Sequence, residues 1–202
     1  MRIGCIWMAS GEGKRFGANK LMADLAGQPV IAHSIEKVPQ ELFVRRLVVT
    51  RWQEVAQLCE QKKIPALLHD RVDRNEVVRL GLQRMQDLDG CLFFQADQPL
   101  CTPQSIQKLV QNFCSQPSEI HRLAWQDAGA SPVIFPACLF GQLLQLPPKK
   151  GGGYVIEQNP QKVRLTQADH PWELWDIDTP EALQRICRQI AQWHEPTGVF
   201  QG

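Results

Sequence analysis

The sequence predicts an α/β protein with a three-layer, Rossmann-like architecture, in which helices cover both faces of a mostly parallel, twisted sheet. Up to about residue 120, short apolar runs alternate with amphipathic stretches, which is the pattern of strands joined by helices. The runs at 3–9 and 91–96 are apolar almost throughout, as expected of strands that are covered on both faces. A chain of 202 residues suits one domain,.

The expected elements follow in order along the chain. Strands are predicted at 3–9, 43–50, 66–69 and 91–96, and helices at 30–38, 52–61, 76–85 and 103–113,. Beyond residue 120 we expect a strand at 120–125, an extended piece at 132–135, a helix at 137–145, a loop at 146–153, and strands at 163–166 and 173–177. Thr179 and Pro180 suit the N-cap and first turn of a last helix that ends near Trp193. One domain is therefore expected over 1–194, with a frayed tail over 195–202.

Composition excludes several classes of partner. The formal net charge is +1, so neither nucleic acid nor an acidic membrane is indicated. The apolar start at 3–9 is too short for a signal sequence or a membrane span, and no later apolar stretch is long enough to cross a bilayer. Seven cysteines are present and none forms a CxxC pair, which favours reduced thiols. We expect a soluble, cytoplasmic protein with no nucleic-acid or membrane partner.

A glycine-rich, basic segment follows the first expected strand. Its chemistry-bearing residues are Gly11, Gly13, Lys14, Arg15, Gly17 and Lys20. The glycines let the backbone approach a ligand closely, and successive N–H groups can then cradle phosphate oxygens. A P-loop is excluded because Arg15 stands where Ser or Thr is required, and the third glycine comes one residue late for a dinucleotide fingerprint. A flexible surface turn is the alternative, but the three cations favour a triphosphate site.

Carboxylates occur at two places that the predicted sheet brings to one edge. Asp97 directly follows the apolar run 91–96, and ligands of doubly wound sheets bind outside the carboxyl ends of strands,. Mg²⁺ takes one or two carboxylates together with substrate phosphates, so Asp97 suits such a site, although it also suits a turn before Pro99. Asp176 and Asp178 lie on one face of an expected strand. Either can complete the metal shell, and Asp178 can instead cap the last helix.

The glycine-rich segment resembles the signature of the MobA-like nucleotidyltransferases, roughly L-A-(A/G)-G-x-x-x-R-(M/F)-G-x-x-K. The matching residues are Ala9, Gly11, Arg15, Gly17 and Lys20. The family's A-D-(Q/M)-P motif is present at 96–99. The D-I-D-T-P-E-D motif of its molybdenum-cofactor branch is present at 176–181, with Ala182 in place of the last acid. The segment 130–135 is similar to the family's acceptor-side G-(H/N)-P-(V/L)-L-F. The resemblance spans residues 1 to about 190 and looks most like molybdenum cofactor cytidylyltransferases.

This resemblance implies a nucleotide-diphospho-sugar transferase-like fold and a Mg²⁺-dependent transfer of CMP from CTP, or another NTP, to the terminal phosphate of molybdopterin or molybdenum cofactor, with release of pyrophosphate. It implies nucleotide binding by Met8, Ala9, Ser10, Gly11, Gly13, Arg15, Gly17, Lys20, Arg79 and Gly81. The catalytic residues would be Arg15, Lys20 and Asp97, and the metal ligands Asp97 and Asp178. Ser131, Pro132 and Lys150 would bind the phosphorylated, pterin-type acceptor. Delivery of the product to a molybdenum hydroxylase is a further implication.

The chain departs from the family pattern at two places. The segment 73–82 keeps Arg79, Gly81 and Leu82 but lacks the serine that often precedes them, and the G-D-x-G-A-R loop is represented only by 149–154, with neither Asp nor Arg. Ser10 matches neither the cytidylyl nor the guanylyl branch. Three alternatives therefore stay open: a guanylyltransferase, a sugar-phosphate nucleotidyltransferase, and a non-catalytic protein that binds a nucleotide or a cofactor. Lys149 and Lys150 belong either to a mobile lid or to a solvated loop.

Overall fold

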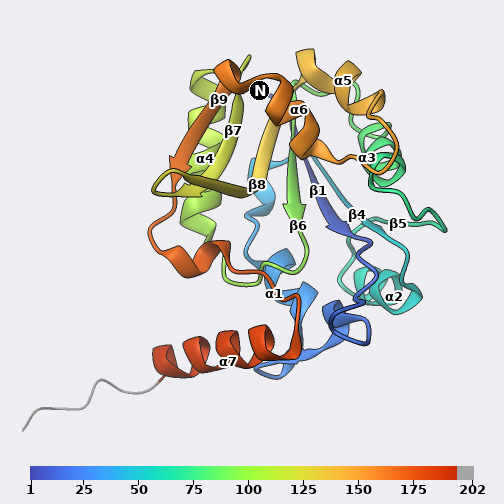
Figure 1. Cartoon of the computed structure of the whole chain (residues 1–202), viewed down its shortest axis with the longest axis vertical. Helices are drawn as coiled ribbons and strands as arrows, with labels where there is room; N and C mark the ends of the chain where they lie inside the picture. The colour runs from blue at the N-terminus through green and yellow to red at the C-terminus, as the bar shows by residue number, and fades with distance from the viewer. Residues whose placement is uncertain (195–202) are drawn as a thin grey trace, which may run out of the picture.

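The computed structural model describes residues 1–194, and the expected tail at 195–202 lies outside this range. Its main feature is a seven-stranded sheet in the order β5-β4-β1-β6-β8-β7-β9 (Figure 1). The strands are β1 (Ile3–Ala9), β4 (Arg45–Thr50), β5 (Ala66–Leu68), β6 (Gly90–Gln95), β7 (Ile120–Trp125), β8 (Ala128–Pro136) and β9 (Val163–Gln167). Within this sheet only β8 runs against the others. The mostly parallel sheet is thus confirmed.

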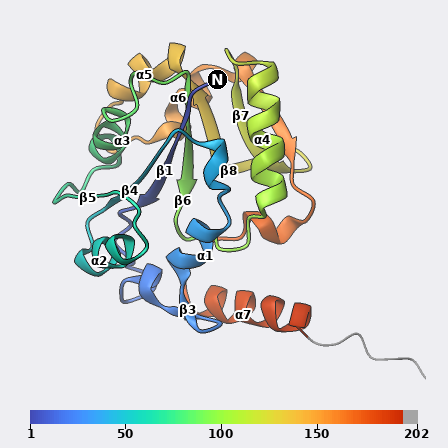
Figure 2. The same ribbon diagram turned by 180° about the vertical axis from the view of Figure 1, so that it is seen from behind.

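Helices cover both faces of the sheet, as the views from opposite sides show (Figures 1 and 2). One face carries α1 (Val30–Glu36), α2 (Gln53–Gln61) and α4 (Pro103–Ser115), and the other carries α3 (Arg74–Leu82), α5 (Phe140–Leu144) and α6 (Gly152–Gln158). Neighbouring residues of β1 point to opposite faces: Trp7 packs in the first layer and Ile6 in the second, and neither is exposed. This alternation explains why the run is apolar throughout, and it confirms the three-layer architecture.

The last helix, α7 (Pro180–His194), lies beyond the carboxyl ends of the central strands (Figure 1). Its Ile186 and Ile190 pack with Leu25, Leu100 and Ile177 in a separate apolar cluster. Leu25 belongs to β2 (Asp24–Leu25), which pairs with β3 (Gln28–Pro29) in a small ribbon. This packing brings residues 176–178 to the edge of the sheet where β1 and β6 end. Among the described residues, no helix combines the length and apolar character needed to span a bilayer.

The strand expected at 173–177 is absent. Residues 171–174 instead form a short 3-10 helix, η5 (Pro171–Leu174), and 175–179 have no regular structure. Glu173 is fully buried, and its carboxylate accepts hydrogen bonds from the backbone N–H groups of Asp169, His170 and Thr102 and from the Thr102 hydroxyl. The side chain therefore ties this segment to the start of α4 in place of a strand ladder. Other 3-10 helices are η1 (Lys20–Met22), η2 (Gln40–Leu42), η3 (Ala137–Leu139) and η4 (Pro160–Lys162).

The expected loop at 146–153 ends earlier than predicted, because α6 begins at Gly152. Three successive glycines disfavour a helix, but Gly152 packs against the Phe135 ring, where an added Cβ would be 3.1 Å from the ring edge. Leu146 and Val155 are buried in the same layer. Tertiary packing therefore overrides the local preference here. The short extended piece expected at 132–135 is also longer, since β8 spans nine residues and pairs with both β6 and β7.

Replacing Glu173 with Gln should destabilise the fold. The amide keeps only one of the two acceptor oxygens and turns an NH₂ group toward buried donors, so we expect the free energy of unfolding to fall by about 1–3 kcal/mol,. Urea denaturation followed by tryptophan fluorescence measures this. Glu157→Gln, at an exposed position of α6, is the matched control and should change stability by less than about 0.5 kcal/mol,. Equal losses for the two variants would contradict the structural role of Glu173.

Candidate functional site

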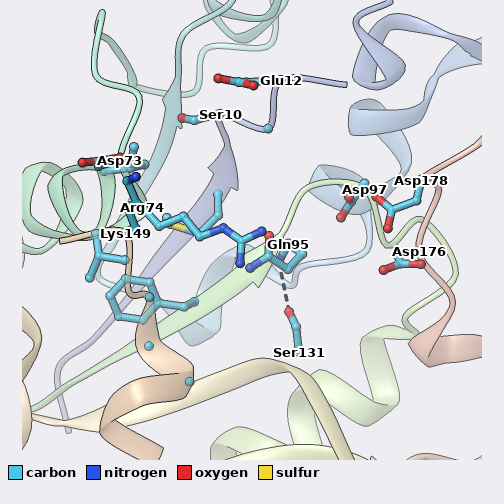
Figure 3. Close-up of a pocket in the computed structure, with 18 of the residues that line it drawn as sticks. Ser10, Glu12, Asp73, Arg74, Gln95, Asp97, Ser131, Lys149, Asp176 and Asp178 are labelled. Atoms are coloured by element: carbon cyan, nitrogen blue, oxygen red, sulfur yellow. Dashed lines mark hydrogen bonds between the residues drawn. The ribbon is translucent and has the colours of Figure 1, made fainter. Parts of the chain in front are cut away.

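A cavity of about 730 Å³ opens at the carboxyl ends of β1 and β6, on the face covered by α3, α5 and α6. Its walls come from the glycine-rich segment, the ends of β6 and β8, the first turns of α3 and α6, and the segment that carries Asp176 and Asp178. Figure 3 shows the carboxylates of Asp97, Asp176 and Asp178 gathered at one end of this space, with Asp73 and Lys149 at the other. The position agrees with the rule that ligands of open α/β sheets bind outside the carboxyl ends of strands.

The glycine-rich segment has a conformation that requires glycine at position 13. Gly13 has a φ of +65°, and a Cβ added there would lie 2.1 Å from the carbonyl oxygen of Ala18. Its own carbonyl accepts hydrogen bonds from the N–H groups of Phe16 and Gly17, at 2.9 Å each. The segment is further anchored by the Trp52 indole, which donates to the carbonyl of Gly11 at 3.0 Å. The backbone is thus held in a tight curl beside the cavity.

Lys20 joins the two predicted carboxylates. Its Nζ donates to Asp97 Oδ2 at 2.5 Å and to Asp178 Oδ1 at 2.6 Å. Only 10% of the Lys20 side chain is exposed, against 16% for Asp97 and 32% for Asp178. Arg15 donates to the other oxygen of Asp178. The structure therefore brings four predicted residues from three distant segments into one cluster.

A backbone hydrogen bond positions the segment that carries Asp176 and Asp178 next to Asp97. The N–H of Ile177 donates to the carbonyl of Asp97 at 3.0 Å, and the Ile177 side chain is fully buried. The neighbouring Asp176 and Asp178 both line the cavity. The alternation expected of a strand is thus kept in this segment, although it forms no strand ladder.

The protonation of the cluster follows from burial and pairing. Burial acts to lower the pKa of Lys20, but the two carboxylates outweigh it and the pKa is raised, so the ammonium stays charged at neutral pH. Hydrogen bonding from Lys20 is the main cause that lowers the pKa of Asp178. Burial is the main cause that raises the pKa of Asp97, against the opposing effect of Lys20. The two carboxyl groups are therefore electrostatically different.

Ser10 lines the cavity, and its hydroxyl is held by polar groups on the side away from the cavity. Its hydroxyl donates to the carbonyl of Val49 at 3.0 Å and lies 2.8 Å from Nε2 of His69. Burial, followed by the charge of Arg51, lowers the pKa of His69. The imidazole Nδ1 accepts the N–H of Arg71 at 3.0 Å. His69 is thus hydrogen-bonded to a residue that lines the cavity.

The floor of the cavity is apolar. It is formed by side chains of the second layer, namely Met8, Val77, Val78, Phe93, Val133, Phe135, Leu143 and Ile156. Phe93 and Phe135 contact each other edge to face, with ring centroids 5.7 Å apart. At the rim, the N–H of Gln95 donates to the Ser131 hydroxyl at 3.0 Å (Figure 3). An apolar floor with polar groups at its margin suits a ligand that has a ring and an ionised substituent.

The predicted residues fall into two groups. Those that line the cavity are Met8, Ser10, Gly11, Gly13, Arg15, Lys20, Asp97, Asp178 and Ser131. Those that do not are Ala9, Gly17, Arg79, Gly81, Pro132 and Lys150. Arg79 Nε instead donates to the carbonyl of Leu144, and Gly81 packs against Ile6 and Val49 of the sheet. The first turns of α3, not its last, reach the cavity, and Lys149 takes the place expected for Lys150.

Within the segment that follows β5, sequence reasoning chose Arg79 and Gly81 and missed two residues at the start of the segment. Asp73 and Arg74 both line the cavity, at the start of α3. The signal was available, because this segment also follows a parallel strand and so must lie at the carboxyl edge. Glu12 was missed as well; it pairs with Lys14 at 2.5 Å and with Arg51 at 3.3 Å.

The donor set suits a metal that arrives with a substrate. No cluster of three or more His, Cys, Asp or Glu side chains within residues 1–194 is arranged to hold an ion. Asp97 and Asp178 nevertheless meet at one cation, the Lys20 ammonium. Mg²⁺ is commonly bound by one or two carboxylates and completed by water and phosphate oxygens. The residues therefore fit Mg²⁺ as part of a nucleotide complex.

Comparison with known proteins gives a family match. Residues 5–164 match the model of the MobA-like NTP transferase domain. The probable molybdenum cofactor guanylyltransferase of Pyrococcus furiosus is 28% identical over 208 residues, which covers 96% of this chain and all of the relative. The 2-C-methyl-D-erythritol 4-phosphate cytidylyltransferase of Dehalococcoides mccartyi is 28% identical over 113 residues, or 52% of this chain. The chain spans half the length of this second relative.

A solved structure shows the same fold. The crystal structure of Rv0371c from Mycobacterium tuberculosis, in complex with manganese, superposes with a TM-score of 0.74 and 18% identity. The match covers 93% of this chain and 99% of that one. The order and direction of the strands described above are therefore those of an established fold, one of whose members holds a divalent metal ion.

Replacing Gly13 with Ala should disrupt the glycine-rich curl. A left-handed conformation costs a non-glycine residue roughly 1–2 kcal/mol, and the new Cβ would also collide with the carbonyl of Ala18. We expect the free energy of unfolding, measured in urea, to fall by at least about 1 kcal/mol. Gly11→Ala is the matched control, because nothing lies within 4 Å of its added Cβ. If both variants unfolded at the same urea concentration, the curl would not depend on Gly13.

Proposed function

This chain belongs to the family of MobA-like NTP transferases and is a nucleotidyltransferase; from that membership we propose that it moves CMP from CTP to the terminal phosphate of a molybdopterin-type acceptor, with Mg²⁺ bound. The observation that carries the proposal is the position of Lys20. Its ammonium lies between Asp97 and Asp178, beside the curl of Gly13. A cation and two carboxylates beside a glycine-rich curl are the parts that bind a triphosphate with its metal.

The proposed reaction is an in-line displacement. An oxygen of the acceptor phosphate attacks the α-phosphorus of CTP, a new P–O bond forms, and the bond to the bridging oxygen of the β-phosphate breaks, so that pyrophosphate leaves with that electron pair. A phosphate monoester is already ionised near pH 7, so no strong general base is required. Catalysis then depends on position and on neutralisation of charge.

In the proposed reaction, different residues of the cavity bind the phosphates, the metal ion and the nucleotide. Lys20 and Arg15 would bind the phosphates of the leaving pyrophosphate, because both project charge from the glycine-rich segment. Asp97 and Asp178 would hold Mg²⁺, which supplies further neutralisation of phosphate charge when bound. Ser10 and the backbone next to it would lie along the nucleotide. In this arrangement the two acids also orient the Lys20 ammonium through its hydrogen bonds.

The apolar floor of the cavity supports a ring-bearing acceptor. A sugar phosphate would need several hydrogen-bonding side chains for its hydroxyls. The floor here instead presents Phe93, Phe135 and aliphatic groups, and Ser131 lies at its margin. An apolar surface of this kind stacks well against a flat heterocycle. This favours a phosphorylated pterin over the erythritol phosphate named for the Dehalococcoides relative.

A second candidate is transfer of GMP from GTP. One observation favours it: the Pyrococcus relative, which matches 96% of this chain, is named a guanylyltransferase. The cytidylyl assignment rests on the motif at 176–181, whose two acids both reach the cavity. The two candidates share every residue of the phosphate and metal cluster and differ only in the base.

A titration with the four NTPs should separate these candidates. We expect CTP to bind more tightly with Mg²⁺ than without it, and more tightly than GTP, ATP or UTP. Asp97→Ala should remove the Mg²⁺ effect and weaken binding by roughly tenfold or more, since each 1.4 kcal/mol lost is a factor of ten. Isothermal titration calorimetry measures these affinities. Asp127→Ala, an exposed acid between β7 and β8, is the matched control.

Three outcomes of this titration would change the proposal or contradict it. Preference for GTP would replace the proposal by the second candidate. An Mg²⁺ effect that survives Asp97→Ala would remove Asp97 from the metal site. Absence of Mg²⁺-linked binding for every NTP would contradict the proposed function.

Replacing Lys20 with Met should lower the rate of pyrophosphate release from CTP and acceptor by roughly 10²–10³-fold, as does the loss of a main electrostatic donor in other active sites. The physical reason is that the ammonium would no longer neutralise charge on the leaving group. Pyrophosphate is measured by a coupled colour assay. Lys63→Met, at an exposed site after α2, should leave the rate unchanged. A comparable rate in the Lys20 variant, with its fold confirmed by circular dichroism, would exclude the assigned role.

A further inference from the structure

The cations that line the cavity differ in their partners. Five basic residues reach it: Lys14, Arg15, Lys20, Arg74 and Lys149. The first three are each paired with a cavity carboxylate. Within the described part of the chain, the side chains of Arg74 and Lys149 form neither a hydrogen bond nor an ion pair. Two cations of the cavity therefore keep their full hydrogen-bonding capacity for a ligand.

Arg74 is positioned by the start of α3 and by the loop that precedes α6. Figure 3 shows its side chain extending from α3 across the cavity toward Gln95. A Cβ added to Gly151 would lie 3.9 Å from both Cβ and Cδ of Arg74, so the stem of the arginine runs along the backbone of that loop. The guanidinium is thus held over the cavity while its stem is supported from the side.

Lys149 is held next to the same helix start. Its backbone N–H donates to Oδ1 of Asn75 at 3.1 Å, and Asn75 is buried. The hydrogen bond fixes the loop to the residue that follows Arg74. Lys149 and the stem of Arg74 consequently start from the same wall of the cavity, opposite the cluster of Asp97 and Asp178, and the Arg74 guanidinium reaches from this wall toward Gln95 (Figure 3).

We propose that Arg74, with Lys149 on the same wall of the cavity, binds the phosphate of the acceptor, a phosphate monoester attached to an apolar or aromatic body. This rests on the proposed function, in which the donor triphosphate is held by the glycine-rich segment. Arg74 and Lys149 belong to the opposite wall and border the apolar floor of Phe135 and Leu143. Arg matches a phosphate with two parallel N–H donors, and Lys adds a point charge.

The same assignment accounts for a departure from the family pattern. The G-D-x-G-A-R loop has no arginine in this chain, where Lys149–Tyr154 stands in its place. The stem of Arg74 passes along this loop at Gly151, and its guanidinium extends from there over the cavity toward Gln95 (Figure 3). The loop itself supplies lysines but no guanidinium, and Arg74 supplies one from α3.

The test is a calorimetric titration with phenyl phosphate, a monoester with an aromatic body, and with inorganic phosphate. Arg74→Gln should weaken phenyl phosphate binding roughly tenfold or more, because two hydrogen bonds to a charged group are lost. Arg74→Lys should recover part of the affinity, since the charge returns without the fork. Affinity for CTP with Mg²⁺ should change less than about threefold in the same variants, because a substitution that does not contact CTP has only a small effect on its binding. Arg84→Gln, exposed and just beyond the end of α3, is the matched control.

Several results would overturn the inference. These are unchanged phenyl phosphate affinity in Arg74→Gln, no binding of phenyl phosphate by the wild type, or an equal loss for phenyl phosphate and CTP, which would assign Arg74 to the donor. Tighter binding of inorganic phosphate than of phenyl phosphate would show that the site does not favour a phosphate with an apolar body. That result would overturn this part of the inference.

The experiment also separates this inference from the proposed function. If the wild type released no pyrophosphate with any NTP while Arg74→Gln still weakened phenyl phosphate binding, the proposed function would fail and the anion site would stand. If pyrophosphate release were normal and the acceptor KM and phenyl phosphate affinity were unchanged in Arg74→Gln, the inference would fail alone. An increase in acceptor KM at constant CTP KM supports it.

Discussion

The ammonium of Lys20 joins segments that are far apart in the chain, and the candidate site takes its form from that contact. Asp97 comes from the end of β6, Asp178 from the segment before α7, and Lys20 from the turn after the glycine-rich curl. Two carboxylates and one ammonium in a half-buried place are tolerated because each neutralises the other. Without the cation, the like charges of the acids would oppose their approach.

The fold supports this contact from outside the cavity. Ile177 is buried against α7 and donates its N–H to Asp97, so the apolar cluster of α7 holds the acid segment in register with the end of β6. Glu173 ties the preceding turn to the start of α4. The last helix is therefore coupled to the site by packing, although none of its described side chains lines the cavity.

Most strands and helices of the first 120 residues were predictable because apolar runs such as those of β1 and β6 have a single satisfactory place, buried on both faces of a parallel sheet,. The meeting of Lys20 with Asp97 was predictable for the same reason, since both residues follow such runs. The segment 173–177 alternates as a strand does, and Ile177 points inward. Its hydrogen bond goes to the carbonyl of Asp97 and not to a neighbouring strand. The local sequence does not show which group accepts this hydrogen bond. The start of α6 at Gly152 depends on the Phe135 ring, a contact distant in sequence.

The placements of Arg79 and Lys150 differ from expectation for a geometric reason. α3 begins at the carboxyl edge of the sheet and then runs away from that edge. Arg74, in its first turn, therefore reaches the cavity, whereas Arg79 lies further along the helix and contacts α5. In the loop, Lys149 has a φ of +65°, and two successive side chains of a turn then point in different directions. Motif matching identifies which segments approach a ligand, but the choice of residue within each segment depends on backbone geometry.

The hydroxyl of Ser10 has one proton, and that proton is committed to the carbonyl of Val49. The imidazole of His69 receives the N–H of Arg71 on Nδ1, so in its neutral form the ring proton is on Nε2 and points at the Ser10 oxygen,. One lone pair of that oxygen remains. Any group that approaches Ser10 from the cavity must therefore bring a proton of its own: an amino group is complementary to this oxygen, and a carbonyl is repelled by it.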